Sequence, residues 1–93
     1  MQNATMINYI CIDKVASVMI KMSAQLIVEG ISQVGKTRIQ EHGNVWVVIG
    51  MSENVNSLKN IPGLLIQSTK TRSVKWMGRE SDEDFKLIST DCN

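Results

Sequence analysis

The chain has 93 residues, of which 43% are apolar and 20% are charged, and its formal net charge is +1. These values are typical of one small folded domain and exclude both a disordered chain and one whose overall charge attracts nucleic acid. No stretch approaches the roughly 20 consecutive apolar residues of a membrane-spanning helix, so we expect no membrane partner.

Cysteine content and the N-terminal sequence predict a cytoplasmic protein. Cys11 and Cys92 are too few for a disulfide framework, and we expect both to be free thiols. Asp13 and Lys14 interrupt the first apolar stretch, and no small-residue cleavage site follows it, so we predict no signal peptide. The single histidine and the absence of a Cys-x-x-Cys pair predict no metal site.

Residues 7–26 show the periodicity of an amphipathic helix, because their apolar positions recur at spacings of three and four. These positions are Ile7, Ile10, Cys11, Val15, Val18, Met19, Met22 and Leu26. Asn3 or Thr5 is a suitable N-cap, and Gly30 is a suitable stop. The C-terminal end stays open, since residues 26–28 fit a short strand as well, two of them being β-branched.

The strongest strand signal is the run of five apolar residues from Val45 to Ile49. We expect Thr37–Glu41 to pair with it as a hairpin around residues 42–44. A two-residue turn would place Ile39 with Trp46 and Val48. We favour a three-residue loop, because it gathers four aliphatic residues on one side: Ile39, Val45, Val47 and Ile49. Arg38, Gln40 and Trp46 would then lie on a half-covered face.

A short helix and a second hairpin are predicted after the strand. Ser52 can cap a short helix over Glu53–Asn60, and Pro62 with Gly63 would end it. Leu64–Ser68 and Ser73–Met77 are predicted to form a second hairpin around residues 69–72. In it, Leu64 and Ile66 would face the core together with Val74 and Trp76.

The last element, Phe85–Ile88, fits either a helical turn or a strand with Phe85 and Leu87 inward, and the sequence leaves both open. The predicted fold is a single α+β domain over residues 1–93. It has an N-terminal amphipathic helix on an antiparallel sheet of about four strands from two hairpins, with a short connecting helix.

Residues 30–37 match the pattern G-x-x-x-x-G-K-[ST] at its fixed positions, which are Gly30, Gly35, Lys36 and Thr37. Over these eight residues the chain resembles the P-loop NTPases. The resemblance implies a glycine-rich backbone around nucleotide phosphates, with Lys36 on the outer phosphates and Thr37 on Mg²⁺. The surroundings differ, because Gly43 follows too soon for a helix of several turns and the chain is too short for several βαβ units. We therefore treat nucleotide binding as an alternative and interpret the segment as a connector entering the first hairpin.

Basic residues gather around Trp76 at the second hairpin: Lys70, Arg72, Lys75 and Arg79. Such residues suit phosphate contacts and base stacking, so a nucleic-acid-binding module is a second alternative, with Lys36 and Arg38 extending the patch. The simpler interpretation is that solvated charges protect an edge strand while Trp76 lies in the core. An acidic run offsets the patch: Glu80, Asp82, Glu83 and Asp84.

No combination of residues indicates an active site. His42 is expected at the tip of a turn, and the acidic residues fall in caps and loops rather than in pairs, so we predict neither enzyme activity nor a cofactor. The expected function is non-enzymatic binding of a protein partner, together with self-association as a homodimer. The residues predicted to bind the partner are Arg38, Trp46, Lys70, Arg72, Lys75 and Arg79.

Overall fold

The computed structural model describes residues 20–90 of the chain. Within this range the elements are β1 (Gln25–Gly30), α2 (Gln33–His42), β2 (Val45–Val55), the 3₁₀ turn η1 (Asn56–Leu58), β3 (Ile61–Ser68), β4 (Val74–Gly78) and β5 (Phe85–Thr90). The strands form one antiparallel five-stranded sheet in the order β4-β3-β2-β1-β5. The predicted α+β class and antiparallel sheet are confirmed, whereas the number of strands is five rather than about four.

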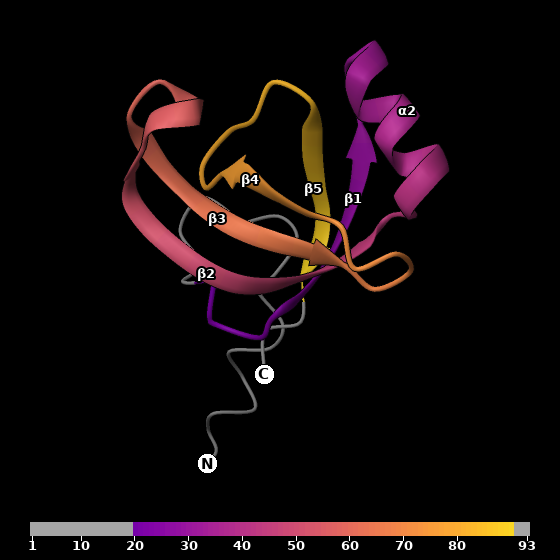
Figure 1. Cartoon of the computed structure of the whole chain (residues 1–93), viewed down its shortest axis with the longest axis horizontal. Helices are drawn as coiled ribbons and strands as arrows, with labels where there is room; N and C mark the ends of the chain where they lie inside the picture. The colour runs from indigo at the N-terminus through magenta and orange to yellow at the C-terminus, as the bar shows by residue number, and fades with distance from the viewer. Residues whose placement is uncertain (1–19, 91–93) are drawn as a thin grey trace.

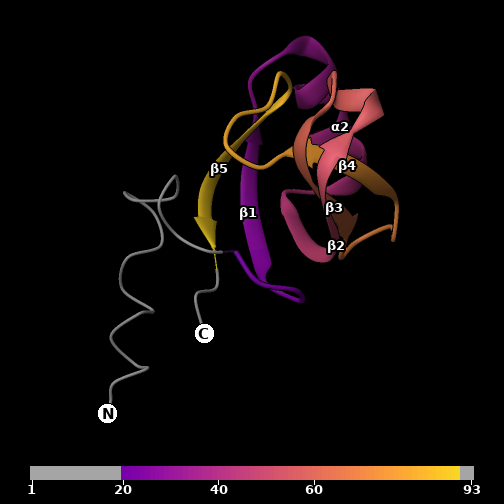
Figure 2. The same ribbon diagram turned by 90° about the vertical axis from the view of Figure 1, so that its left-hand side faces the viewer.

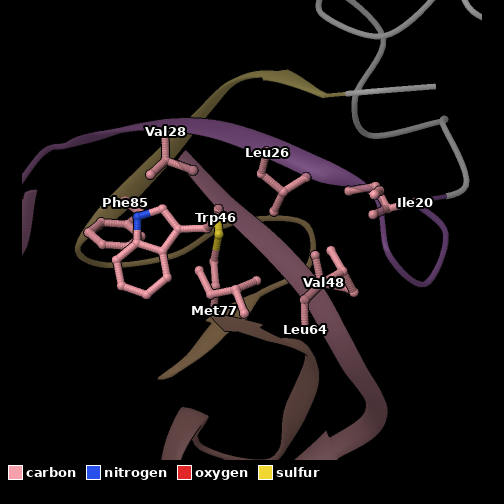
Figure 3. Close-up of a cluster of buried hydrophobic side chains, with 10 residues drawn as sticks. Ile20, Leu26, Val28, Trp46, Val48, Leu64, Met77 and Phe85 are labelled. Atoms are coloured by element: carbon pink, nitrogen blue, oxygen red, sulfur yellow. The ribbon is translucent and has the colours of Figure 1, made fainter. Parts of the chain in front are cut away.

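The sheet bends around its own core, as the long curved ribbons of β2 and β3 show (Figures 1 and 2). All five strands contribute to a single buried apolar cluster together with the segment that precedes β1. Its members are Ile20, Ala24, Leu26, Val28, Trp46, Val48, Leu64, Ile66, Met77 and Phe85. Trp46 packs against Phe85 with ring centroids 5.5 Å apart (Figure 3). Since alternate residues of a strand point to opposite faces, one face of each strand builds this core.

The predicted N-terminal helix lies mostly outside the described residues. Its predicted C-terminal end is part of β1, where Leu26 and Val28 are buried and Ile27 is exposed, so the strand alternative for residues 26–28 is confirmed. The α-helix of the described range, α2, follows β1 and lies beside it (Figure 1).

The predicted first hairpin is wrong, because residues 37–41 belong to α2. Ser32 caps this helix by accepting a hydrogen bond from the Gly35 N–H, and Gly43 ends it with a φ of 79° and an N–H bonded to the Ile39 carbonyl. Between these caps Ile39 packs against the core. The two caps and the inward Ile39 stabilise a helix in this segment, and the loose alternation of residues 37–41 did not predict it.

The predicted strand over residues 45–49 is confirmed as the first part of β2, but its buried face is the opposite of the predicted one. Trp46 and Val48 are buried at 1% exposure, whereas Ile49 is 38% exposed. The prediction that Trp46 lies on a half-covered face is therefore wrong. Its indole instead fills the core, and its Nε1–H donates to the Gly43 carbonyl at 3.0 Å, which satisfies the polar atom.

The predicted short helix over residues 53–60 is also wrong, because β2 continues to Val55 and only η1 is helical. Pro62 and Gly63, predicted to turn the chain, lie within β3. The second hairpin is confirmed as β3 and β4, and residues 85–90 form a strand with Phe85 buried.

The β3–β4 register corrects the predicted core face of β4. Leu64 pairs with Met77 and Ile66 with Lys75, so Met77 and Lys75 point inward. Val74 and Trp76 therefore point outward, and Val74 is 45% exposed.

Candidate binding site

A pocket of about 570 Å³ opens beside β4, between that strand, η1, α2 and the β4–β5 loop. Its volume falls within the roughly 300–1,000 Å³ that ligand pockets occupy. We call it the seam pocket, and it is lined by Arg38, Ser57, Leu58, Lys59, Ile61, Lys75, Trp76, Ser81, Asp82, Glu83 and Asp84. Three residues from the sequence-based hypotheses, Arg38, Lys75 and Trp76, meet here although they come from two distant elements.

Lys75 enters the pocket from the inner face of β4. Its side chain is only 14% exposed, and its Nζ lies 3.8 Å from Asp82 Oδ2 and 4.2 Å above the centroid of the Phe85 ring. Burial lowers the pKa of Lys75 below the ordinary 10.5, and nearby Arg38 lowers it further. Asp82 and Asp84 oppose this shift without cancelling it. The nearby carboxylates therefore compensate the charge of the Lys75 ammonium group only in part.

The two aspartates that face Lys75 are already engaged in holding the β4–β5 loop. Asp82 Oδ1 accepts from the Gly78 N–H at 2.8 Å, and its Oδ2 accepts from the N–H groups of Asp84 and Phe85. Asp84 Oδ1 accepts from the Ser32 hydroxyl at 2.5 Å. These two carboxylates therefore serve the backbone and a helix cap in addition to the Lys75 charge, and within residues 20–90 neither forms an ion pair with Arg38.

Arg38 provides the second cation of the pocket, from α2. It makes no ion pair with any residue in the range 20–90, and its Nε is buried without a hydrogen-bond partner there. A buried N–H donor that lacks an acceptor costs about 1–3 kcal/mol, so this atom would gain from an acceptor that enters the pocket.

The remaining predicted partner-binding residues lie elsewhere. Lys70 and Arg72 sit in the β3–β4 turn, where the stem of Lys70 lies beside Gly43. Arg79 pairs with Glu53 through two 3.2 Å hydrogen bonds. Trp46 is buried in the core and offers no surface to a partner. The basic residues of the second hairpin therefore do not form one patch around Trp76.

Three residues of the GxxxxGKT segment, Gly30, Ser32 and Gly35, form a tight contact with Asp84 that we call the glycine junction. A side chain on Gly35 would overlap the Asp84 carbonyl group, and one on Gly30 would overlap the backbone of residues 35 and 36. The Asp84 carboxylate lies at the start of α2, where a negative charge suits the helix dipole. This packing accounts for both glycines without a bound phosphate.

The other two pattern residues sit on α2 itself. The helix begins at Gln33, ahead of Gly35 and Lys36, and the Lys36 side chain is exposed. Thr37 donates its hydroxyl hydrogen to the Gln33 carbonyl at 3.0 Å. In a P-loop the glycines and the lysine would instead wrap the phosphates ahead of the helix.

Sequence reasoning did not identify Asp82 and Phe85 as the residues that surround Lys75. It treated Asp82 as part of an acidic run and Phe85 as the start of an undecided element. The available signal was Asp82-x-Asp84 shortly before an apolar residue, because an aspartate side chain commonly bonds backbone N–H groups two and three residues onward.

Residues 20–90 contain no group of three or more potential metal ligands, and no helix in this range has the length and apolar character that crossing a membrane requires. Comparison with known proteins gives no significant match to any family model, curated protein or solved structure.

Proposed function

We propose that the chain is a small cytoplasmic binding protein without catalytic activity, and that it holds a protein partner in the seam pocket. The observation that carries this proposal is the pair of cations, Arg38 and Lys75, that the pocket holds with incomplete compensation. Trp76 adds a half-buried aromatic surface at the same opening. Arginine and tryptophan are the residue types most often found at the centre of protein interfaces.

The proposal is tested by comparative affinity capture from a nuclease-treated lysate. The bait proteins are the wild type, Arg38→Glu, Trp76→Ala and the control Arg72→Glu, which makes the same charge change at an exposed site outside the pocket. We expect one stoichiometric partner to be retained at moderate salt by the wild type and the control, and to be lost from both pocket variants.

Retention of the same partner by Arg38→Glu and Trp76→Ala would contradict the proposed site. A partner that the wild type captures from an untreated lysate but not from the nuclease-treated one would indicate that nucleic acid mediates the binding. The variants must first show the wild-type circular dichroism spectrum, since a general loss of folding would also abolish capture.

Self-association is the second part of the proposal, and exposed apolar residues on β2 favour it. Ile49 and Met51 are 38% and 39% exposed, although Trp46 and Val48 of the same strand are buried in the core. Light scattering over a wide concentration range should show a dimer for the wild type and a monomer for Ile49→Asp. A wild-type monomer at every concentration would exclude the homodimer.

A further inference from the structure

The hydrogen bonds between β3 and β4 show which backbone groups of β4 are free. The Ser68 N–H bonds the Ser73 carbonyl at one end of the ladder, and the Arg79 N–H bonds the Pro62 carbonyl at the other. In an antiparallel pair, bonded and non-bonded positions alternate. In the register given above, Lys75 and Met77 therefore bond β3, while Val74, Trp76 and Gly78 direct their N–H and C=O groups away from it.

This outer edge of β4 is open over two residues. The Gly78 N–H is taken by Asp82 Oδ1, which agrees with its outward direction. Among residues 20–90 no strand pairs with β4 on this side, and Val74 and Trp76 have no other backbone partner. The edge thus offers two N–H donors and two carbonyl acceptors to an extended segment of another chain.

The seam pocket lies along the same edge. Lys75 lines it from the inner side of β4 and Trp76 from the outer side. The side chains of an added strand alternate between two faces. A residue placed opposite Trp76 would therefore contact the indole, and a neighbouring residue placed opposite Lys75 would enter between the ammonium group and Arg38.

The charge of Lys75 makes this edge selective. An inward-pointing charge on an edge strand discourages apolar strands from pairing with it, because they would bury the charge uncompensated. A strand that carries a carboxylate at that position removes the penalty and also provides an acceptor for Arg38 Nε. The same charge therefore excludes most strands and admits an acidic one.

We infer that β4 recognises an extended peptide segment, which adds as a sixth strand and places an Asp or Glu side chain between Lys75 and Arg38 and an apolar side chain on Trp76. This inference rests on the proposed protein-binding function and specifies its ligand. The acidic residues Asp82, Glu83 and Asp84 also line the pocket, so only a single carboxylate placed between the two cations is favoured. A nucleic acid fits less well, because these residues and the exposed Glu80 would repel its successive phosphates.

The sequence requirement is tested with a displayed library of random seven-residue peptides. We expect selection to enrich peptides with Asp or Glu at one fixed position and an apolar residue next to it. Selected peptides should bind Arg38→Gln and Lys75→Met at least about tenfold more weakly than the wild type, which corresponds to the loss of one charged hydrogen bond. The matched control Arg72→Gln should bind them with unchanged affinity.

The strand geometry is tested on the wild-type protein by amide hydrogen exchange. With a selected peptide bound, the N–H groups of Val74 and Trp76 should become protected, whereas those of Lys75 and Met77, already bonded to β3, should change little. Val74→Pro removes an outward donor and no β3 bond, so it should weaken binding about tenfold relative to Val74→Thr.

The outcomes separate this inference from the proposed function. If capture yields a pocket-dependent partner but Val74 and Trp76 stay unprotected by it, strand addition is wrong while partner binding stands. Enrichment without a fixed acidic position, failure to enrich any peptide, or tighter binding of a short single-stranded RNA would also overturn the inference. If Arg38→Glu and Trp76→Ala still capture the same partner as the wild type, or if the wild type captures no partner, the proposed function itself is wrong.

Discussion

The glycine junction and the seam pocket are neighbours that share Asp84, and they differ in how completely their polar groups are satisfied. At the junction, Ser32 both accepts from Gly35 and donates to Asp84, and the glycines leave no space. In the seam pocket, Arg38 Nε and the Lys75 charge lack full partners. The segment with the recognisable sequence pattern is thus closed by packing, whereas the segment without a pattern keeps groups that a ligand can satisfy.

The largest expected effect comes from filling the junction. Gly35→Ala would place a methyl group against the Asp84 carbonyl oxygen and 2.8 Å from the Asp84 carbonyl carbon, which are both backbone atoms. We expect a loss of about 3 kcal/mol in the free energy of unfolding, at the upper end for an overpacked site. Urea denaturation measures this loss, and a stable Gly35→Ala variant would show that the junction is looser than described.

Lys36→Ala is the matched control, since it changes the neighbouring pattern residue at an exposed helical position. Its free energy of unfolding should change by less than about 0.5 kcal/mol. The same variant tests the nucleotide-binding alternative, which stays a prediction. A thermal shift of the wild type with ATP or GTP and Mg²⁺, lost in Lys36→Ala, would support it.

A smaller effect is expected where the two regions share a loop. Asp82→Ala would leave three backbone N–H groups without their acceptor and remove the nearest carboxylate from Lys75. We expect a loss of about 2 kcal/mol in urea denaturation. Glu83→Ala, an exposed neighbour, should change stability little. Equal effects of the two substitutions would mean that Asp82 does not hold the loop.

The cap of α2 should contribute less. Ser32→Ala removes the acceptor for the Gly35 N–H and the donor to Asp84, and a lost N-cap costs about 1 kcal/mol. Ser32→Asp would restore the acceptor but face the Asp84 carboxylate, so it should rescue only part of the loss. Full rescue by aspartate would show that Asp84 contributes little at this position.

The smallest expected effect is a dependence of stability on pH that originates in the seam pocket. Because the pKa of Lys75 is lower in the folded state than the ordinary 10.5, the folded protein releases this proton at a lower pH than the unfolded chain does. The unfolded state then binds more protons between the two values, and stability from this group rises with pH in that window. Lys75→Met should remove the rise, whereas Lys59→Met, an exposed lysine, should keep it.

Urea denaturation from neutral pH up to 10.5 measures the difference between these two variants. Direct titration of the Lys75 side chain by nuclear magnetic resonance provides the independent check. A Lys75 pKa at or above 10.5 would show that its charge is fully compensated, and the contrast between junction and pocket would then disappear.

Local signals in the sequence were sufficient for several elements. The β3–β4 hairpin was predictable because two alternating segments flank a polar turn, and Arg72 takes the positive φ of 68° that closes it. The strand character of residues 45–49 was also predictable from five consecutive apolar residues. Helix α2 was not, because its few apolar residues give a weak period, and its caps were interpreted as a connector and a turn.

The candidate site was predictable only as separate residues. Arg38 was expected on a strand, and Lys75 and Trp76 were each assigned to the wrong face of β4. Nothing in the sequence places residue 38 beside residues 75 and 82, since the contact depends on α2 packing at the end of a curved sheet.

The amino-acid sequence by itself determined the α+β class, the strand character of residues 45–49, 64–68 and 74–77 and the position of the second turn, because these depend on local periodicity and turn chemistry. Only the tertiary structure decided which face of each strand is buried and which charges remain unsatisfied. The physical reason is that a shift of one residue in register reverses every side chain of a strand, and the register is set by packing between distant segments.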